Sequence, residues 1–573
     1  MSGRTYGTME AAIGGWMINE IEPHVALRLK SLFPRIPRHA RVPFYLTGGP
    51  QLDADLSWFL MRYPLRMSEA DAAKLAERKT LFEVQQEALG SILSPDWKPT
   101  TKLMFRHNRP PYPYQQQAAE MCRRLGRLLL LDDVGMGKTI SALATVATPE
   151  CLPAAIVVQP HLADQWKDEY IDAFTHLKAH IIKGTKPYEL PPADIYIFRY
   201  TNIAGWVDYI DQAPFKSVVF DEIQELRHGV GTAKGAAAKA FLTHAQFKMG
   251  LTATPIYNYG SEIFNIIDYL DPGSLGSWID FTTEWCTPLG SGKWKVDNPP
   301  ALGTHMAEQH LSLRRVEGDV GRQMPPVNTI IQTVPYDEEV AAESEDLARQ
   351  LALTVTRGDF HSSGQAAREF NALMRHTTGV AKARHVAAFV KILLEAGRPI
   401  LLTGWHRDVY EIWNRELADH NPIMFTGSET TTAKRKAKKA FMSGETNLLI
   451  MSLRSGTGLD GLQERGSTVV FGELDWSPQV HKQVIGRLRR PGQMQQVDAI
   501  YLVADGGSDP YVVTTLGIKA DQSRGILDPL AGVEQQHTDA SRIKELADLY
   551  LQGKSRIGTL PRQREPEQTT MFD

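Results

Sequence analysis

The sequence predicts an α/β protein with two tandem lobes, each built on a parallel sheet. Two series of short apolar runs support this prediction, and loops of polar or small residues separate the runs from helical patterns. The first series covers residues 128–131, 155–158, 195–198, 218–220 and 247–251, and the second covers 400–403, 423–425, 447–451, 468–471 and 497–503. Such runs are typical of buried parallel strands in a βαβ array.

Length and composition limit the class of protein. A chain of 573 residues is too long for one hydrophobic core, and 42% hydrophobic with 23% charged residues fits a soluble globular protein. No apolar run is long enough for a membrane helix and no secretory signal is visible, so we expect a cytoplasmic protein. Cys122, Cys151 and Cys286 lie too far apart to indicate a zinc module or a disulfide framework. Because the net charge is −3, a nucleic-acid binder must concentrate its cations along one track.

Composition shifts along the chain predict five parts. The Gly-, Pro- and Trp-rich stretch near 273–326 indicates insertions and a linker rather than a sheet, and the stretch from Ser68 to Leu93 reads as helical with Ser68 as N-cap. The expected parts are an N-terminal accessory domain (1–102), the first lobe (103–275), an insertion and inter-lobe linker (276–326), the second lobe (327–535) and a polar tail (536–573).

A glycine loop after the first strand indicates a phosphate site. Residues 128–131 run into Asp132-Asp133-Val134-Gly135-Met136-Gly137-Lys138-Thr139 and then into a helical pattern. Glycines let backbone N–H groups close around phosphates, and the helix N-terminus adds partial positive charge. Lys138 is placed to reach the β- and γ-phosphates, and Thr139 to ligate Mg²⁺. A strict P-loop has glycine or alanine at position 132, so a glycine turn beside a core strand remains the alternative.

Two carboxylates end a later strand. Residues 218–220 lead into Asp221 and Glu222, which suit a Mg²⁺–ATP site: Asp221 would hold the metal and Glu222 would activate the attacking water. The alternative is a capped strand end with solvated acids. Thr252 follows another strand, where its hydroxyl could link the phosphate site to a nucleic-acid surface.

Arginines near the end of the second lobe suit phosphoryl transfer. Arg487 and Arg490 are three residues apart in a helical stretch, so we expect them to share a face. If these guanidinium groups come from the second lobe and Lys138 from the first, they reach the γ-phosphate only when the lobes close, so closure would activate hydrolysis. An exposed basic helix that binds phosphate without specificity is the alternative.

Together these motifs resemble the Snf2 family of helicase superfamily 2 over residues 112–528. In order, Tyr114-Gln115 looks like the adenine-reading segment, 132–139 like motif I, 158–160 with Trp166 like motif Ia, 221–224 like motif II and 251–258 like motif III. That family commonly has an acid at the position of Asp132, which accounts for the departure from the P-loop formula. Gln224 stands where many relatives carry histidine, and Ala253 replaces a more usual glycine.

The resemblance continues beyond the first lobe. Residues 313–326 are similar to the stretch joining the two lobes in Snf2 proteins, residues 402–413 and 426–428 to the start of lobe two, and residues 475–493 to the final motif. Residues 452–463 resemble motif V with one loop glycine missing and Gly461 added. Residues 1–102 are similar to segments that precede the motor in phage-encoded Snf2 proteins and annealing-helicase relatives.

The resemblance implies two RecA-like lobes that use ATP and Mg²⁺. It implies catalysis by Lys138, Asp221, Glu222, Arg487 and Arg490, with metal ligands Thr139 and Asp221. The implied nucleotide-binding residues are Gln115, Asp133, Gly135, Gly137, Lys138, Thr139, Gln224 and Gln483. Nucleic acid would cross both lobes opposite the ATP cleft, and its expected contacts are His161, Tyr200, Thr201, Thr252, Trp405, His406, Ser455 and Thr457.

Five cations lie between Lys434 and Lys439 and invite two interpretations. A basic run can be a nuclear localisation signal, but Ala437, Ala440 and Phe441 give this segment an apolar face, so we predict a folded helix capped by Thr432. Its charges would be either solvated or in contact with a nucleic-acid backbone.

Three functional hypotheses follow. The first is an ATP-dependent translocase on double-stranded DNA, forked or branched DNA included, in replication, recombination or repair. The second is a strand-separating DNA or RNA helicase, and the third is a nucleotide-gated nucleic-acid-binding scaffold, which the full set of catalytic residues disfavours. No bromodomain, chromodomain or zinc module is visible, which argues against a chromatin remodeller. We expect a monomer without a membrane partner, associated with the nucleoid of a bacterial or phage-infected cell rather than with a nucleus.

Overall fold

A computed structural model of the chain describes residues 4–37, 39–47, 49–212, 215–253, 260–290, 293–321, 325–357, 360–453, 461–490, 492–513, 544, 546–548, 550 and 551. These residues fall into two compact units, 4–321 and 325–551. Within them, no helix combines the length and the apolar character needed to cross a bilayer. All three cysteines are buried and free.

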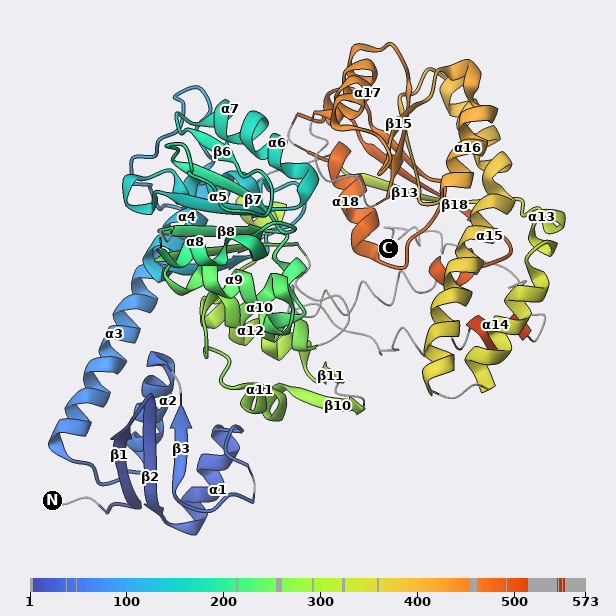
Figure 1. The fold of residues 1–573 in the computed structure, drawn as a ribbon. Coiled ribbons are helices and arrows are strands. Elements are labelled where there is room, and N and C mark those ends of the chain that lie inside the picture. The colour runs from blue at the N-terminus through green and yellow to red at the C-terminus, as the bar shows by residue number, and fades with distance from the viewer. Residues whose placement is uncertain are drawn as a thin grey trace, which may run out of the picture. The chain divides into compact units, whose positions relative to one another are not determined.

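The chain begins with a small α+β fold. In the described part, β1 (Gly7–Ala12), β2 (Gly15–Ile21) and β3 (Phe44–Thr47) form a three-stranded antiparallel sheet, accompanied by α1 (Pro23–Leu32) and α2 (Pro50–Arg62) (Figure 1). Trp16 and Phe59 are buried in its core, whereas Trp58 is 65% exposed. The Trp16 indole donates a hydrogen bond to buried Asp53, which also pairs with Arg78 at 2.9 Å.

Helix α3 (Glu69–Leu93) connects this fold to the first large sheet (Figure 1). The predicted N-cap is confirmed, because the Ser68 hydroxyl accepts a hydrogen bond from the Asp71 amide at 3.0 Å. Leu89 and Ile92, near the end of α3, are buried in the core around α4 (Pro113–Leu125). The last turns of α3 are therefore part of the first lobe's packing.

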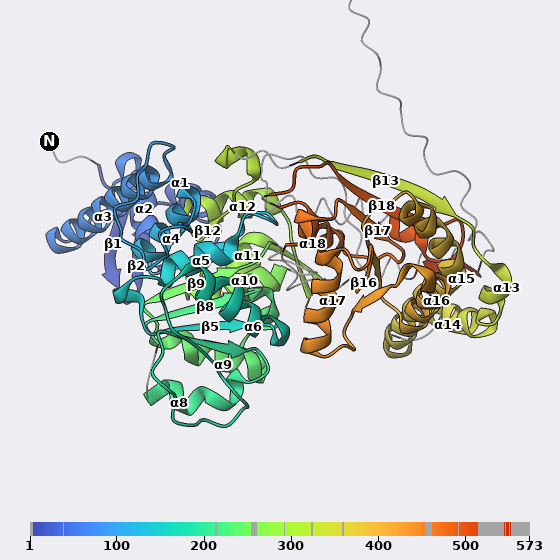
Figure 2. The same ribbon diagram turned by 90° about the horizontal axis from the view of Figure 1, so that it is seen from above.

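The first lobe is a parallel sheet covered by helices on both faces (Figures 1 and 2). Its seven described strands follow the order β12-β4-β9-β8-β5-β7-β6. Their bounds are β4 (Arg127–Leu130), β5 (Ala154–Val158), β6 (Ala179–Ile181), β7 (Ile195–Arg199), β8 (Ser217–Asp221), β9 (Phe247–Leu251) and β12 (Ser312–Leu313). Successive residues of β4 pack into the hydrophobic cores on opposite faces of the sheet, Leu128 on one face and Leu129 on the other. The five strands predicted for this lobe are confirmed.

The segment predicted to be linker without sheet is more ordered than expected. It contains α11 (Trp278–Trp285), the hairpin β10 (Cys286–Gly290) and β11 (Lys293–Val296), α12 (Pro299–Glu308) and the edge strand β12. Leu302, Met306 and Leu311 are buried in the first lobe's core. Its Gly and Pro residues lie between or at the ends of short elements, and its buried apolar residues pack into the core of the first lobe.

The second unit also carries a parallel sheet. Its six described strands follow the order β13-β18-β17-β14-β16-β15. They are β13 (Val327–Val334), β14 (Ile400–Gly404), β15 (Ile423–Phe425), β16 (Leu448–Ser452), β17 (Thr468–Phe471) and β18 (Val497–Ala504). All five strands predicted here are confirmed, and β13 is an addition. The main helices are α14 (Glu345–Arg357), α15 (Phe360–Glu395), α16 (Arg407–Glu416), α17 (Thr431–Ser443) and α18 (Pro478–Leu488).

Two local expectations for the second unit need correction. Helix α17 is capped by Thr430, whose side chain accepts from the Ala433 amide at 3.2 Å, and not by Thr432, which lies inside the helix. Two apolar residues of the tail expected to be polar, Leu546 and Ala547, are buried against Phe370 of α15. The first difference reflects which of three successive threonines accepts the local capping hydrogen bond, and the second reflects tertiary packing that a local pattern does not report.

Candidate ATP site

The phosphate loop joins β4 to α5 (Lys138–Val146). Gly135 and Gly137 have φ of 88° and 76°, a backbone region in which an L side chain is strained. A Cβ at Gly137 would also lie 2.6 Å from Nε2 of Gln115, so glycine is required there on two grounds. Lys138 donates from Nζ to the carbonyl oxygens of Asp132 and Asp133, at 2.7 and 3.3 Å. Burial lowers the pKa of Lys138, while Glu222 and the two aspartates oppose that shift.

The segment expected to contact adenine is hydrogen-bonded directly to this loop. Gln115 is buried at the start of α4, where its Nε2 donates to the Met136 carbonyl at 3.2 Å and its Oε1 accepts from the Tyr112 amide at 2.9 Å. The Tyr114 hydroxyl donates to the same Met136 carbonyl at 2.7 Å. The exposed Tyr112 ring stacks on Tyr114 with centroids 5.9 Å apart. Gln115 and the glycine loop thus form one hydrogen-bonded assembly.

Asp132, the residue that departs from the P-loop formula, has a structural partner. Its carboxylate is fully buried and accepts two hydrogen bonds from Arg315, from Nε at 3.0 Å and from a terminal nitrogen at 2.5 Å. Arg315 also donates to the Tyr114 carbonyl at 2.5 Å. The acid therefore connects the phosphate loop to the segment that follows β12. Arg315 was placed by resemblance, but its partner could not be read from the sequence because it lies 183 residues away.

The two predicted catalytic carboxylates stand at the end of β8. Asp221 accepts a hydrogen bond from Nε1 of Trp166 at 2.8 Å, and burial, followed by the charge of Glu222, raises the pKa of Asp221 to about 7. Glu222 has φ of 54°, an unusual backbone conformation for a residue with a side chain, and accepts from Nε2 of Gln224 at 2.5 Å. Strain at this position is typical of a functional turn. Trp166 is a residue whose role the sequence did not reveal.

Thr139 and Asp221 supply the oxygen ligands that Mg²⁺ prefers. Thr139 lies half-buried in the first turn of α5, and Asp221 lies at the end of β8, two strands from β4 in the same sheet. Burial and the charge of Glu222 raise the pKa of Asp221 although Lys138 opposes the shift, and a divalent ion beside it would favour the charged form. The donor set therefore fits the metal.

The structure places the expected nucleic-acid contacts of the first lobe in two environments. His161 and Thr201 lie on exposed turns at the ends of β5 and β7. Tyr200 is 5% exposed, and its hydroxyl donates to the backbone carbonyl of Asp221 at 3.0 Å. Thr252 has no exposed surface. Tyr200 thus supports the strand end that carries the carboxylates, whereas the Thr252 amide donates to the Leu130 carbonyl of β4.

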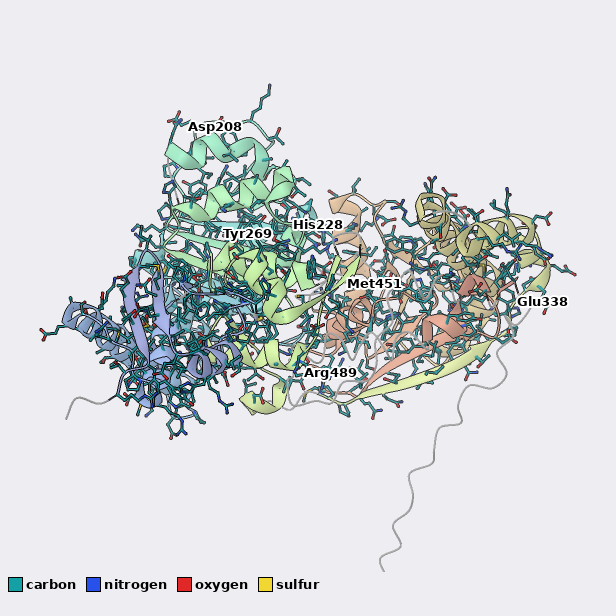
Figure 3. The ribbon with its side chains drawn as sticks, turned by 90° about the horizontal axis from the view of Figure 1, so that it is seen from below. Asp208, His228, Tyr269, Glu338, Met451 and Arg489 are labelled. Carbon is teal, nitrogen blue, oxygen red and sulfur yellow. The ribbon has the colours of Figure 1, made fainter. Side chains whose placement is uncertain are left out.

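The second unit positions its candidates on α18 and on the turn after β14. Gln483 and Arg487 are half-buried in α18. The expectation that Arg487 and Arg490 share a helix face is wrong, because α18 ends at Leu488 and Arg490 lies beyond it. Arg490 nevertheless stays close to the last turn, since its Nε donates to the Gly486 carbonyl at 2.7 Å. Arg489, labelled in Figure 3, donates to the Pro325 carbonyl at 3.0 Å.

A buried carboxylate fixes the turn after β14. One oxygen of Glu473 accepts from the amides of Trp405 and His406, at 2.6 and 2.9 Å, and the other lies 2.6 Å from Nδ1 of His406. Glu473 is 4% exposed, and although burial raises its pKa, these hydrogen bonds outweigh burial and lower it. Glu473 was not singled out from the sequence. Ser455 and Thr457, expected to act beside this turn, lie outside the described residues.

Comparisons with known proteins agree with these motifs. Residues 114–380 match the family described as the SNF2-related domain. The chain is 27% identical over 416 residues to the Xenopus tropicalis SWI/SNF-related matrix-associated actin-dependent regulator of chromatin subfamily A-like protein 1, covering 70% of this chain and 43% of that protein. It is 25% identical over 427 residues to the Mus musculus DNA annealing helicase and endonuclease ZRANB3, covering 71% and 40%. The chain thus spans less than half the length of these two relatives.

Among solved structures, the chain is similar to the Sulfolobus solfataricus SWI2/SNF2 ATPase core in complex with dsDNA. That match has 18% sequence identity and a TM-score of 0.37, and covers 81% of this chain and all of the other.

A glycine loop with its lysine, two carboxylates at another strand end of the same sheet and a second parallel-sheet unit are the features expected of an ATP hydrolase of helicase superfamily 2. Residues 114–380 match the SNF2-related domain, and the chain is similar to two Snf2-type proteins over about 70% of its length.

Proposed function

We propose that this protein is a motor that hydrolyses ATP to move along double-stranded DNA. The observation that carries the proposal is the placement of Lys138, Asp221 and Glu222 directly after β4 and β8 of one parallel sheet, within the residues that match the SNF2-related domain. Such an arrangement suits phosphoryl transfer, which depends on positioning and charge stabilisation more than on covalent chemistry.

The residues divide the chemistry between them. Gly135, Gly137 and the N-terminus of α5 receive the phosphates, and Lys138 contacts the β/γ region. Asp133, Gln224 and Gln483 assist nucleotide binding, and Gln115 contacts the adenine. Thr139 and Asp221 would hold Mg²⁺, which would neutralise phosphate charge, while Glu222 orients and deprotonates the attacking water. Arg487 and Arg490 supply the positive charge that makes turnover depend on both units.

Duplex DNA is the proposed track. The Xenopus relative is named as a regulator of chromatin, the mouse relative as a DNA annealing helicase, and the solved Sulfolobus core as a complex with dsDNA. The exposed positions His161 and Thr201, and the turn of Trp405 and His406, offer side chains for contacts that do not read sequence. Forked or branched DNA as a preferred substrate, and a role in replication, recombination or repair, are part of the same proposal.

The deciding experiment compares ATP hydrolysis with no nucleic acid, duplex DNA, single-stranded DNA, forked DNA and RNA. Duplex should stimulate hydrolysis most, and the enzyme should displace a third strand from a triplex without separating the duplex. Stimulation by RNA alone, or separation of strands without triplex displacement, would replace this proposal with a helicase function. Nucleic-acid binding gated by ATP without measurable turnover would indicate a scaffold.

A further inference from the structure

Helix α17 carries an unusual distribution of charge. Its sequence, residues 431–443, contains five cations and no acid. Ala437, Ala440 and Phe441 are buried, so one face of the helix belongs to the core beside β15 and β16. Lys436 and Lys439 lie on the exposed side, three residues apart and therefore on one face. The prediction of a folded amphipathic helix is confirmed, which leaves the role of its basic face open.

The cations of α17 repel one another and oppose the helix dipole. Lys434 and Lys438 are four apart, as are Arg435 and Lys439, and like charges at this spacing cost about 0.2–0.5 kcal/mol per pair. They also begin in the first turn, where the helix terminus is itself partly positive. The spacing of these cations is thus unfavourable within the helix itself, and an anionic ligand on its exposed face would reduce the repulsion.

Two other exposed helices of the chain have the opposite arrangement. In α3, Lys79 pairs with Glu83 at 3.5 Å, and in α16, Arg407 pairs with Glu411 at 3.7 Å. Both pairs place opposite charges four residues apart, as a solvated helix normally does. Helix α17 departs from the pattern that the same chain uses elsewhere.

We propose that the exposed face of α17, centred on Lys436 and Lys439, binds the phosphate backbone of duplex DNA. This inference rests on the proposed function and adds a contact outside the motifs assigned above. The two lysines are about 4.5 Å apart along the helix axis, close to the roughly 3.4 Å axial spacing of phosphates along one strand. The helix's one aromatic residue, Phe441, is buried, so this face has no ring on which an unpaired base could stack. The surface thus suits a duplex better than a single strand.

The test measures duplex affinity against salt for the full chain and for the double variant Lys436→Gln/Lys439→Gln. Each phosphate contact contributes about 0.9 to the slope of log affinity against log salt, so the variant's slope should be shallower by about 1.8. Between 50 and 200 mM salt the wild type should then lose about 12-fold more affinity than the variant. Arg384→Gln/Lys391→Gln, which removes two exposed cations from α15 of the same unit, should keep the wild-type slope.

The outcomes separate the inference from the function on which it rests. A shallower slope in the α17 variant alone, with a melting temperature no lower than that of the wild type and unchanged hydrolysis in the absence of DNA, supports the inference. Equal slopes in wild type and α17 variant, or equal losses in both double variants, overturn it while leaving the duplex motor intact. A wild-type protein that does not bind duplex at all overturns the proposed function and the inference together.

Discussion

The ion pair between Asp132 and Arg315 gives the sharpest prediction of stability. Arg315 supplies two hydrogen bonds to a carboxylate that has no exposed surface. The substitution Arg315→Ala would leave that charge buried without its partner, which typically costs about 3–5 kcal/mol. Arg315→Lys would keep the charge but not the two-pronged geometry, so we expect a smaller loss of about 1–3 kcal/mol. Removing both partners in Asp132→Ala/Arg315→Ala should recover part of the loss, because no uncompensated charge remains.

A second ion pair provides the matched control. Lys167 and Asp172 also lie 2.5 Å apart, but their side chains are 34% and 43% exposed. Because water screens such a pair, Lys167→Ala should cost less than about 1 kcal/mol. The two variants thus differ in burial rather than in distance.

Hydrogen exchange of amides in β4 and α5 is the suitable assay, since it reports the free energy of opening of the first lobe separately from the second unit. A loss of 3 kcal/mol corresponds to exchange that is about 150-fold faster. If Arg315→Ala speeds exchange no more than Lys167→Ala does, the assignment of the buried pair as a main support of the phosphate loop is refuted.

Three further predictions concern chemistry and pH. Glu222→Gln should bind nucleotide but hydrolyse it at least about 100-fold more slowly, because the general base is lost; turnover at the wild-type rate in a steady-state assay would contradict this role. Arg487→Ala and Arg490→Ala should each lower turnover by about 10³ or more while nucleotide affinity, measured by fluorescence titration, stays unchanged. Burial lowers the pKa of His481 to about 4, so between pH 6.5 and 4 this histidine binds more protons in the unfolded state than in the folded state. The second unit should therefore lose about 3 kcal/mol of stability as the pH falls from 6.5 to 4. His481→Gln should flatten this dependence in denaturation curves, and an unchanged slope would show that another group is responsible.

The sequence predicted the strands well because buried parallel strands are continuous apolar runs. All ten strands inferred from such runs are present, with ends that shift by at most one residue. The strands of the two parallel sheets that were missed differ physically: β13 is mostly part-exposed, β12 has two residues, and β6 is short and only part-buried. A short or half-exposed strand has too little apolar pattern to stand out from a loop, and its pairing partner decides its conformation.

The candidate site was predicted as a set of residues, but its supporting contacts were not. Asp221 and Lys138 were identified from their motifs. The hydrogen bond from Trp166 to Asp221 and the hydrogen bonds from the turn after β14 to Glu473 each join residues more than fifty positions apart. Such contacts have no local signature. They are formed by the parallel topology, which brings the carboxyl ends of distant strands to one edge of a sheet.

Arg315 also shows why an acid suits position 132. Glycine or alanine there would leave the buried Arg315 guanidinium without the carboxylate that accepts two of its hydrogen bonds, since the guanidinium needs a planar anionic partner at that depth. With aspartate, the side chain holds Arg315 while the backbone carbonyl of the same residue accepts from Lys138. The amide of Asp133 donates in turn to the Arg315 carbonyl at 3.1 Å. Lys138 and the segment after β12 are thus attached to the same two aspartates. A nucleotide that draws Lys138 away from these carbonyls would therefore act on a loop to which Arg315 is also bound.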